Sequence, residues 1–244
     1  MKSTERHRLK QNEVASTVVR LTETYDAYKH QITIGLVAVA VIVAAVVGVV
    51  MWRAQTSSQA SAMLADAMTA ERAQVAPAPV PGATAPAPAP AGSYPTEKAR
   101  NEAALAKFMA VASGYPASDA GIAARYHAAA VLAALGRHAE AEQRYQEVVD
   151  RAGKSVYGQM AKLGKAEAEV AAGKFDGAIA VYKALSADKE GELPVDGILM
   201  QLGRACDAAG KPADARQAFK RIVDEFPQSA YSAEAKRALD QIKG

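Results

Sequence analysis

The most apolar stretch of the chain lies between residues 32 and 52. It reads ITIGLVAVAVIVAAVVGVVMW, with no charged side chain and with Thr33 as its only hydroxyl. A helix of this length measures about 32 Å, which matches the ~30 Å hydrocarbon core of a membrane. Backbone polar groups in lipid must bond within their own segment, so the stretch is predicted to be a transmembrane helix despite its many valines.

A cleaved signal peptide is the alternative interpretation of this stretch. Signal peptides carry apolar runs of about 7–15 residues after a short basic segment. Here the run is longer, and residues 1–31 precede it. The triplet Ala60-Ser61-Ala62 fits the small-x-small cleavage pattern but lies well beyond the run. We therefore favour a permanent anchor over residues 32–52.

Basic residues flank the apolar run unequally. Arg53 follows it closely, and the next basic residue is Arg72. The preceding segment is richer in basic residues: Lys2, Arg6, Arg8, Lys10, Arg20 and Lys29. Cytoplasmic flanks carry the excess of Lys and Arg, so the amino terminus is predicted to be cytoplasmic and the bulk of the chain to lie across the membrane. In a bacterium, which the Ala-rich composition suggests, this describes a single-pass inner-membrane protein with a periplasmic domain.

Residues 1–31 form the predicted cytoplasmic tail. Residues 3–31 contain no Gly or Pro, and apolar side chains recur there in steps of four and three: Val14, Val18, Leu21, Tyr25 and Tyr28. This spacing indicates an amphipathic helix. Such a helix could pair with a partner helix, lie along the membrane surface or remain solvated.

Small residues within the anchor form a candidate surface for helix packing in the membrane. Ala40, Ala44 and Gly48 follow each other at intervals of four residues. Small residues at this spacing let two transmembrane helices approach closely. The same spacing also arises by chance in an Ala/Val-rich segment, so both interpretations stay open.

Residues 53–75 are predicted to form a further helix. From residue 54 onward the segment lacks Gly and Pro and carries an apolar face: Ala60, Met63, Leu64, Ala67, Met68 and Val75. Such a stripe requires another element to cover it. Residues 76–96 follow as a Pro/Ala-rich flexible loop, because alternating Ala-Pro lacks the donors for regular structure and adopts extended polyproline conformations.

A period of 37 residues organises the chain from residue 97 to residue 244. Helical positions repeat in strict register: Ala104, Ala141, Ala178 and Ala215, then Phe108, Tyr145, Tyr182 and Phe219, then Val111, Val148, Leu185 and Ile222. The intervening turns contain Gly136, Gly173 and Gly210, where glycine permits a positive φ at a helix end. Internal repeats of this length indicate a solenoid of helix pairs with a capping helix at its carboxyl end.

The array is missing one helix at its start. Counting one period back from Gly136 gives Ala99, so residues 97–113 correspond to the second helix of an earlier pair. We expect residues 53–75 to supply the first helix of that pair, with residues 76–96 looping out between them. Loop entropy rises only slowly with length, so such an insertion is tolerable. Contacts between Met63, Leu64 or Met68 and the face formed by residues 105–108 would follow from this arrangement.

These repeated positions resemble the tetratricopeptide (TPR) signature: Gly in the turn, Ala and an aromatic residue in the second helix, and Pro at the end, as in Pro116 and Pro227. The resemblance covers residues 97–243. The Leu-Gly pair expected in the first helix is clear as Leu202-Gly203, whereas Leu163-Gly164 lies two residues early and the first repeat has Ala128-Ala129. The fold class implied is all-α, with one transmembrane helix followed by an α-solenoid of TPR-like pairs.

The whole layout resembles the ancillary subunit of the bacterial Sec translocon, SecYEG (the YfgM-like family). That resemblance is architectural and implies an inner-membrane protein associated with the translocon and with periplasmic chaperones. Other anchored TPR proteins share the plan.

No arrangement of residues indicates an enzyme, a cofactor site or a metal site. The histidines His7, His30, His127 and His138 lack ligand spacing with other Asp, Glu or Cys residues, and Cys206 fits a small buried position. The net charge is +3, and residues 97–244 carry nearly equal numbers of basic and acidic side chains. This balance argues against nucleic acid as a partner. We expect no catalysis and no small-molecule substrate.

The predicted working surface is the face built from the first helix of each repeat, which would suit an extended or helical peptide. Its candidate residues are Tyr126, His127, Ala130, Met160, Leu163, Glu167, Met200, Gln201 and Arg204. Several of them could instead be buried between helices. The preferred function is a membrane-anchored periplasmic protein–protein interaction scaffold, ancillary or chaperone-like to the Sec translocon. The alternative is a coordinator of envelope assembly or cell division.

Overall fold

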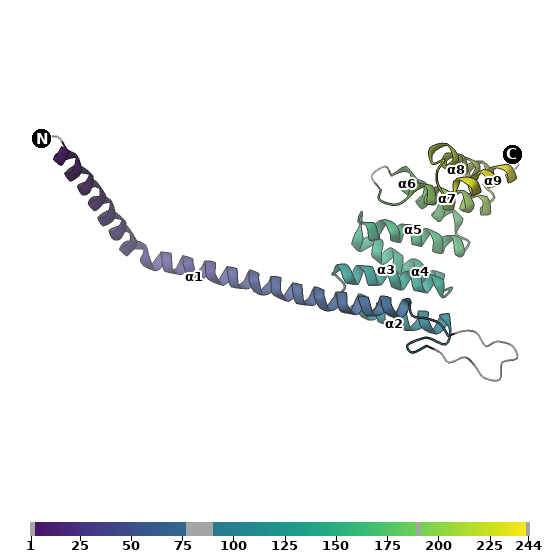
Figure 1. The fold of residues 1–244 in the computed structure, drawn as a ribbon, viewed down its shortest axis with the longest axis horizontal. Helices are drawn as coiled ribbons and strands as arrows, with labels where there is room; N and C mark the ends of the chain where they lie inside the picture. The colour runs from purple at the N-terminus through teal and green to yellow at the C-terminus, as the bar shows by residue number, and fades with distance from the viewer. Residues whose placement is uncertain (1–2, 77–89, 189–190, 243–244) are drawn as a thin grey trace. The chain divides into compact units, whose positions relative to one another are not determined.

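The computed structural model describes residues 3–76, 90–188 and 191–242, and these residues are helical apart from their connections (Figure 1). The helices are α1 (Ser3–Glu71), α2 (Glu97–Gly114), α3 (Asp119–Ala134), α4 (His138–Ala152), α5 (Val156–Ala171), α6 (Phe175–Ala187), α7 (Val195–Ala208), α8 (Pro212–Glu225) and α9 (Ser232–Gln241). The chain divides into two compact units, Met1–Gln55 and Thr56–Gly244. The predicted all-helical class is confirmed over the described residues.

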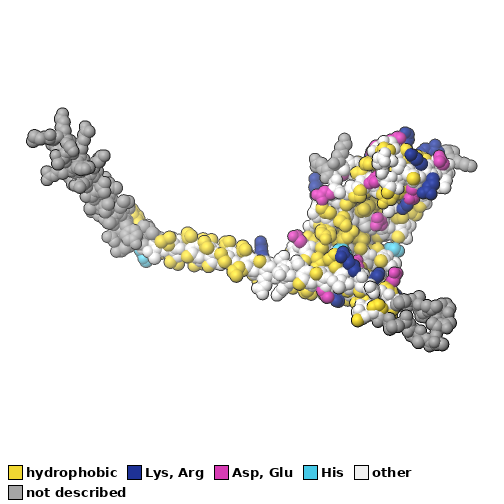
Figure 2. Space-filling view, in the orientation of Figure 1, with side chains coloured by type: hydrophobic (Ala, Val, Ile, Leu, Met, Phe, Trp, Pro, Cys, Tyr) yellow, Lys and Arg dark blue, Asp and Glu magenta, His cyan; other side chains and the backbone are white. Residues whose placement is uncertain are grey.

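The first unit consists of helix α1 up to Gln55. Within the described residues, α1 contains the one stretch long and apolar enough to cross a membrane, inside Thr33–Glu71. Its apolar side chains, such as Ile42 and Val46, are exposed along the helix (Figure 2). In the predicted tail, Tyr28 is exposed, while the side chains of Val14, Val18, Leu21 and Tyr25 lie outside the described residues.

The second unit is a stack in which each helix from α2 to α9 contacts the next one in the chain. Helices α2, α3 and α5 are capped by the residues just before them, Thr96, Ser118 and Ser155, whose side chains accept a hydrogen bond from a backbone N–H in the first turn. Such caps satisfy donors that have no partner within the helix. Helix α3 also contacts α5, so first helices of neighbouring pairs touch directly.

Glycine ends the first helix of each pair in the same way three times. Gly136, Gly173 and Gly210 have φ values of +75°, +76° and +68°. The residue after each glycine donates its backbone N–H to a carbonyl five positions earlier, as from Lys174 to Glu169 at 2.7 Å. This is the hydrogen bond of a Schellman motif. The prediction that glycine takes a positive φ in these turns is confirmed.

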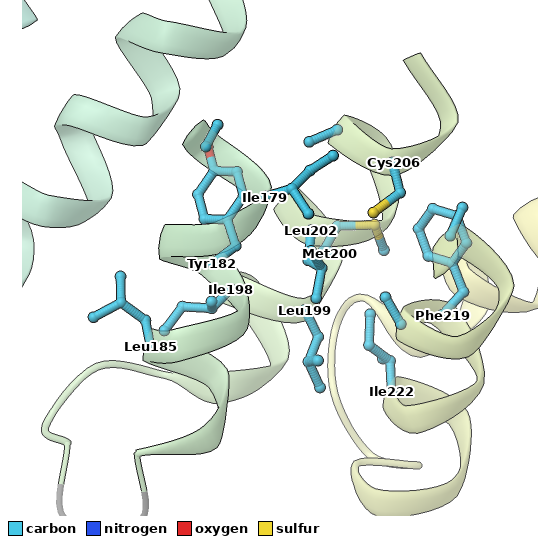
Figure 3. Close-up of a cluster of buried hydrophobic side chains, with 14 of the residues drawn as sticks. Ile179, Tyr182, Leu185, Ile198, Leu199, Met200, Leu202, Cys206, Phe219 and Ile222 are labelled. Atoms are coloured by element: carbon cyan, nitrogen blue, oxygen red, sulfur yellow. The ribbon is translucent and has the colours of Figure 1, made fainter. Parts of the chain in front are cut away.

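The residues in strict 37-residue register form the interior of the unit. Ala104, Ala141, Ala178 and Ala215 are all 0% exposed. The aromatic residues one turn later are buried as well, and Figure 3 shows Tyr182 and Phe219 within the largest cluster, between α6, α7 and α8. Alanine lets paired helices approach closely, and the aromatic ring fills the space beside them.

The end of α1 belongs to the second unit. Ala67 and Ala70 are buried in one cluster with Phe108 and Val111 of α2, and Leu64 and Met68 pack against that cluster. Lys107 of α2 also donates to Asp66 at 2.8 Å. The apolar face expected over residues 53–75 is therefore buried at Ala60 and covered by α2 and α3 from residue 64 to residue 70, while Met63 is exposed.

Two backbone hydrogen bonds join the segments on either side of residues 77–89. Ala76 donates to Tyr94 at 2.8 Å, and Tyr94 donates to Gln74 at 2.9 Å. Residues 77–89, which make up most of the predicted Pro/Ala-rich loop, lie outside the described part of the chain. Residues 74–76 and Tyr94, which flank this segment, therefore lie side by side.

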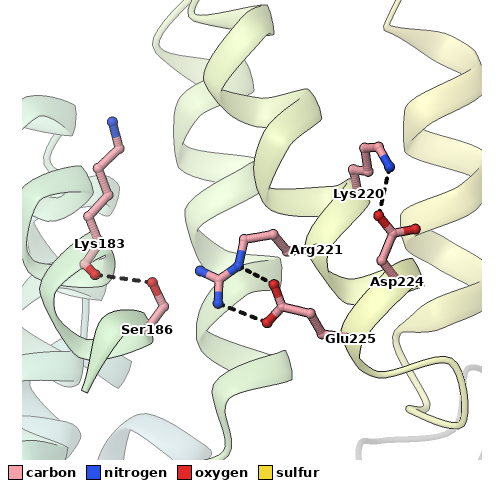
Figure 4. A network of polar contacts seen from close by, with 6 residues as sticks. All are labelled: Lys183, Ser186, Lys220, Arg221, Asp224 and Glu225. Carbon is pink, nitrogen blue, oxygen red and sulfur yellow. Dashed lines mark hydrogen bonds and ion pairs between the residues drawn. The ribbon is translucent and has the colours of Figure 1, made fainter. Parts of the chain in front are cut away.

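Charged side chains on the outer surfaces of the helices pair with each other. On α8, Arg221 binds Glu225 through two hydrogen bonds and Lys220 binds Asp224 at 2.6 Å (Figure 4). Exposed pairs of this kind contribute about 0.3–0.5 kcal/mol each. They favour solubility more than they decide the fold.

Candidate interaction face

The nine residues predicted to line the face lie on α3, α5 and α7, the first helices of three pairs. Glu167 and Arg204 are exposed, and six others are half-buried: Tyr126, His127, Ala130, Met160, Leu163 and Gln201. We use the term inner face for the exposed and half-buried members of this set. It combines aromatic, thioether and charged groups in one row of helices.

Met200 does not belong to the inner face. It is 1% exposed and lies among Leu199, Cys206 and Phe219 (Figure 3). The reason is that α7 packs between α6 and α8, in a cluster that reaches Ala235 of α9. The expectation that Met200 offers a contact to a partner is therefore wrong, and its role is packing.

Tyrosine rings from three helices meet on the inner face. The ring of Tyr126 on α3 lies 5.7 Å, centroid to centroid, from Tyr145 on α4 and 5.7 Å from Tyr157 on α5. We call these three residues the tyrosine cluster. Tilted and edge-on rings at this separation attract each other beyond the area they bury.

Gly164 makes room for the tyrosine cluster. A Cβ at this position would lie 2.5 Å from Cζ of Tyr145 and 2.8 Å from its hydroxyl oxygen. Only glycine leaves space for the ring. Gly203 plays a similar part on α7, where a Cβ would collide with the ring of Phe219. In the sequence, Leu163-Gly164 lies two residues before the position expected from the repeat. The structure gives the reason: Gly164 contacts Tyr145 of the preceding helix pair, whereas Gly203 contacts Phe219 of its own pair.

Tyr157 was not among the predicted residues. Its spacing offered a signal, because Tyr157, Met160, Gly164 and Glu167 follow each other in steps of three, four and three on α5. Residues at these steps share one face of a helix. The 37-residue count missed Tyr157 because the residues one period away, Ala120 and Pro194, are not aromatic.

His127 is engaged within the protein. Its ring stacks on Phe108 with centroids 5.1 Å apart, and Nδ1 lies 3.4 Å from Oε2 of Glu71 on α1. Burial lowers the pKa of His127, against a smaller opposing effect of the Glu71 carboxylate. The imidazole is therefore neutral near pH 7 and joins the end of α1 to α3.

The two charged residues of the inner face differ in their surroundings. Arg204 on α7 donates to Glu234 on α9 at 2.6 Å. Glu167 on α5 has no hydrogen bond or ion pair with any residue that the structure describes. Although solvent reaches its side chain, loss of hydration among neighbouring helices raises the pKa of the Glu167 carboxyl. An unpaired carboxylate in such a place is a candidate contact for a ligand.

The proposed membrane-packing residues lie on an open side of α1. Ala40 and Ala44 are exposed, and a Cβ added at Gly48 would meet no atom within 4 Å. Packing of a second helix along this line stays a prediction.

Cys206 is buried, and burial raises the pKa of its thiol. This is the expected packing position. Among the described residues, no three His, Cys, Asp or Glu side chains are grouped in a way that could hold a metal ion. The inner face offers ring faces, flexible apolar side chains and a carboxylate.

Comparison with known families identifies the repeats. Models of the tetratricopeptide repeat match residues 123–155 and residues 163–230, which include most of α3, all of α4, the second half of α5, and α6 to α8. The chain contains tetratricopeptide repeats. This confirms the fold class predicted from the 37-residue period, and the TPR fold is typically an interaction scaffold without catalytic activity. These matches do not show membership of the translocon-associated family.

Two solved structures illustrate the likeness in fold. A tetratricopeptide repeat protein from Parabacteroides merdae is 16% identical, with 60% of this chain and 55% of that chain covered and a TM-score of 0.50. The nearly identical TPR-like repeats assigned to a kinesin light chain of Podosopora anserina are 17% identical, with 59% and 85% covered and a TM-score of 0.49. No curated protein matches the chain significantly. Identities this low concern the fold alone.

Proposed function

We propose that this protein is a membrane-anchored scaffold whose tetratricopeptide repeats bind protein partners in the bacterial periplasm, as an ancillary or chaperone-like subunit of the Sec translocon. The repeats support the scaffold, since stacked helix pairs present a long surface to a partner. The apolar part of α1 supports the anchor. The order of tail, apolar helix and repeats supports the association with the translocon, because it resembles the layout of the ancillary translocon subunit.

The observation that supports the proposal best is that helix α1 contains both the candidate membrane span and residues buried in the second unit. The apolar run ends at Trp52, and Ala60, eight positions later, is already buried in the second unit. In our interpretation the end of α1 acts as the first helix of the first repeat. A tether this short would restrict partners to proteins that reach the membrane surface.

The orientation can be tested with reporter fusions. We expect a reporter that is active only in the periplasm to work after Gln55 and after Gly244, and to fail after Lys29, because the basic flank precedes the apolar run. Enzyme activity in intact cells, normalised to the amount of fusion protein, is the measurement. Activity after Lys29 and inactivity after Gly244 would reverse the orientation. A mature chain beginning near Met63 would show a cleaved signal instead.

The identity of the partner can be tested by co-purification in mild detergent after crosslinking in cells. The matched control is a chain truncated after Val75, which keeps the tail and anchor and loses the rest of the repeat domain. Translocon subunits recovered with the full chain and lost with the control would support the proposal. Cell-division or outer-membrane assembly proteins in their place would favour the alternative function. An identical set with both chains would contradict binding through the repeats.

A further inference from the structure

We propose that Glu167 and the half-buried rings of Tyr126 and Tyr157 receive a lysine or arginine side chain from a protein partner. This inference rests on the proposed function, because it states which chemistry the repeats recognise. The occupant is thus a peptide segment with a positive charge among apolar residues.

The first support is that Glu167 has no cationic partner in the described part of the chain, although its own helix and the next two helices carry cations that pair elsewhere. On its own helix, Lys165 donates to Glu169 at 2.6 Å. On the next helices, Lys183 of α6 donates to Asp214 at 2.7 Å, and Arg204 of α7 donates to Glu234 at 2.6 Å. Glu167 forms no such pair with the described residues. A carboxylate without a partner can bind a ligand cation through a charge-assisted hydrogen bond.

The second support is the position of Glu167 among the rings. It lies one turn after Gly164 on the same face of α5, and the hydroxyl end of Tyr145 packs on Gly164. The negative charge of Glu167 contributes to raising the pKa of Tyr126, Tyr145 and Tyr182. A charge that acts on tyrosines from α3, α4 and α6 lies close to all three helices.

The third support is the match between these groups and a basic side chain. Lys and Arg have apolar stems that pack along rings and thioethers, such as Tyr157 and Met160, with a charged head that a carboxylate binds. Ring faces also attract cations directly. A norleucine-like chain would leave Glu167 unpaired, and an acidic chain would be repelled by it. A cationic side chain is the occupant that can both pair with the Glu167 carboxylate and pack its apolar stem against the rings and the thioether.

The test uses the full chain in detergent micelles and four fluorescein-labelled ten-residue peptides. They differ at one central position, which is Lys, Arg, norleucine or Glu, with the same apolar residues on both sides. We expect the Lys and Arg peptides to bind about tenfold more tightly than the norleucine peptide, as for a charge-assisted hydrogen bond. Fluorescence anisotropy measures the dissociation constants.

Three variants distinguish a local effect of Glu167 on peptide binding from an effect of the net charge of the protein. Glu167→Gln should remove the preference for Lys over norleucine. Glu167→Lys should reverse it, so that the Glu peptide binds best. Asp224→Asn on α8 changes the net charge by the same amount as Glu167→Gln and should leave the preference unchanged, since Asp224 pairs with Lys220 away from α5.

The results distinguish this inference from the proposed function. If wild type binds the Lys and norleucine peptides equally, or binds none of the four, the inference is overturned, while the co-purification still decides the function. Equal effects of Glu167→Gln and Asp224→Asn would also overturn it, because general charge would then explain the preference. Loss of partners from the full chain in cells, with charge-selective peptide binding intact, would count against the function alone.

Discussion

Helices α5 and α7 occupy the same place in successive repeats, yet their inner surfaces differ. At positions 37 residues apart, α5 has the unpaired Glu167, and α7 has Arg204 bound to Glu234. Helix α5 meets the tyrosine cluster, and α7 buries Met200. The apolar frame beneath both is the same, with Ala178 and Ala215 fully buried. The repeat period therefore specifies the buried apolar positions, whereas the polar residues at equivalent surface positions differ in type and in partner.

Enlarging the alanines of the shared frame should have the largest effect. We expect Ala178→Leu and Ala215→Leu each to lower the free energy of unfolding by roughly 1–3 kcal/mol, because neither site has room for a larger side chain. Thermal unfolding of the full chain in detergent measures this, with exposed Ala180→Leu on α6 as the matched control. An unchanged melting temperature for Ala178→Leu would mean that α5 and α6 do not pack in the register described.

Substitutions of Gly164 on α5 and Gly203 on α7 should have the next largest effect on the free energy of unfolding, and they test the two helices independently. Gly164→Ala and Gly203→Ala each introduce a Cβ into an aromatic ring, a cost that the better helix propensity of Ala offsets in part. We expect a net loss of about 1–2 kcal/mol at either site.

Double-mutant cycles then show which ring each glycine accommodates. Gly164→Ala should couple with Tyr145→Leu by about 0.5–3 kcal/mol and be additive with Phe219→Leu. Gly203→Ala should show the opposite pattern. Coupling of Gly164→Ala with Phe219→Leu would contradict the assignment of one ring to each helix.

The smallest effect concerns the two charges. Because burial raises the pKa of Glu167 in the folded protein, stability is lost as the pH rises from the unfolded value of ~4.3 through the folded pKa. Glu167→Gln should therefore match wild type near pH 4 and be more stable by a few tenths of a kcal/mol at pH 8. Arg204→Gln should be slightly less stable, since it loses an exposed ion pair. A less stable Glu167→Gln at pH 8 would indicate a partner for Glu167 within the chain.

The parts of the fold that repeat were predictable from the sequence. Alanine, the aromatic residue and glycine recur at fixed intervals, and each has a physical reason to recur: close helix approach, filling of the gap and a positive φ. The apolar run was equally clear, and its described side chains are exposed along α1, which makes it a candidate membrane span. The cover of residues 64–70 by α2 also followed the expected register.

The inner face was less predictable because its groups depend on contacts between repeats. Arg204 is neutralised by Glu234, a residue of the capping helix 30 positions away, and no period relates the two. Met200 was misassigned because its burial depends on α6 and α8 together. Gly164 broke the signature spacing since it serves a ring from the preceding pair. A single sequence shows the types of these residues but not which neighbours they meet.

The backbone bonds that join Gln74 and Ala76 to Tyr94 have a consequence for how this chain can vary. Because these bonds close the segment at its base, the packing of the end of α1 on α2 does not depend on the number of residues between positions 76 and 90. A change of length there would add loop entropy only as a logarithm and would leave the contacts of Ala67, Asp66 and Phe108 in place. Relatives are expected to differ in length at this point first, and an epitope tag placed there should report on the protein without altering its repeats.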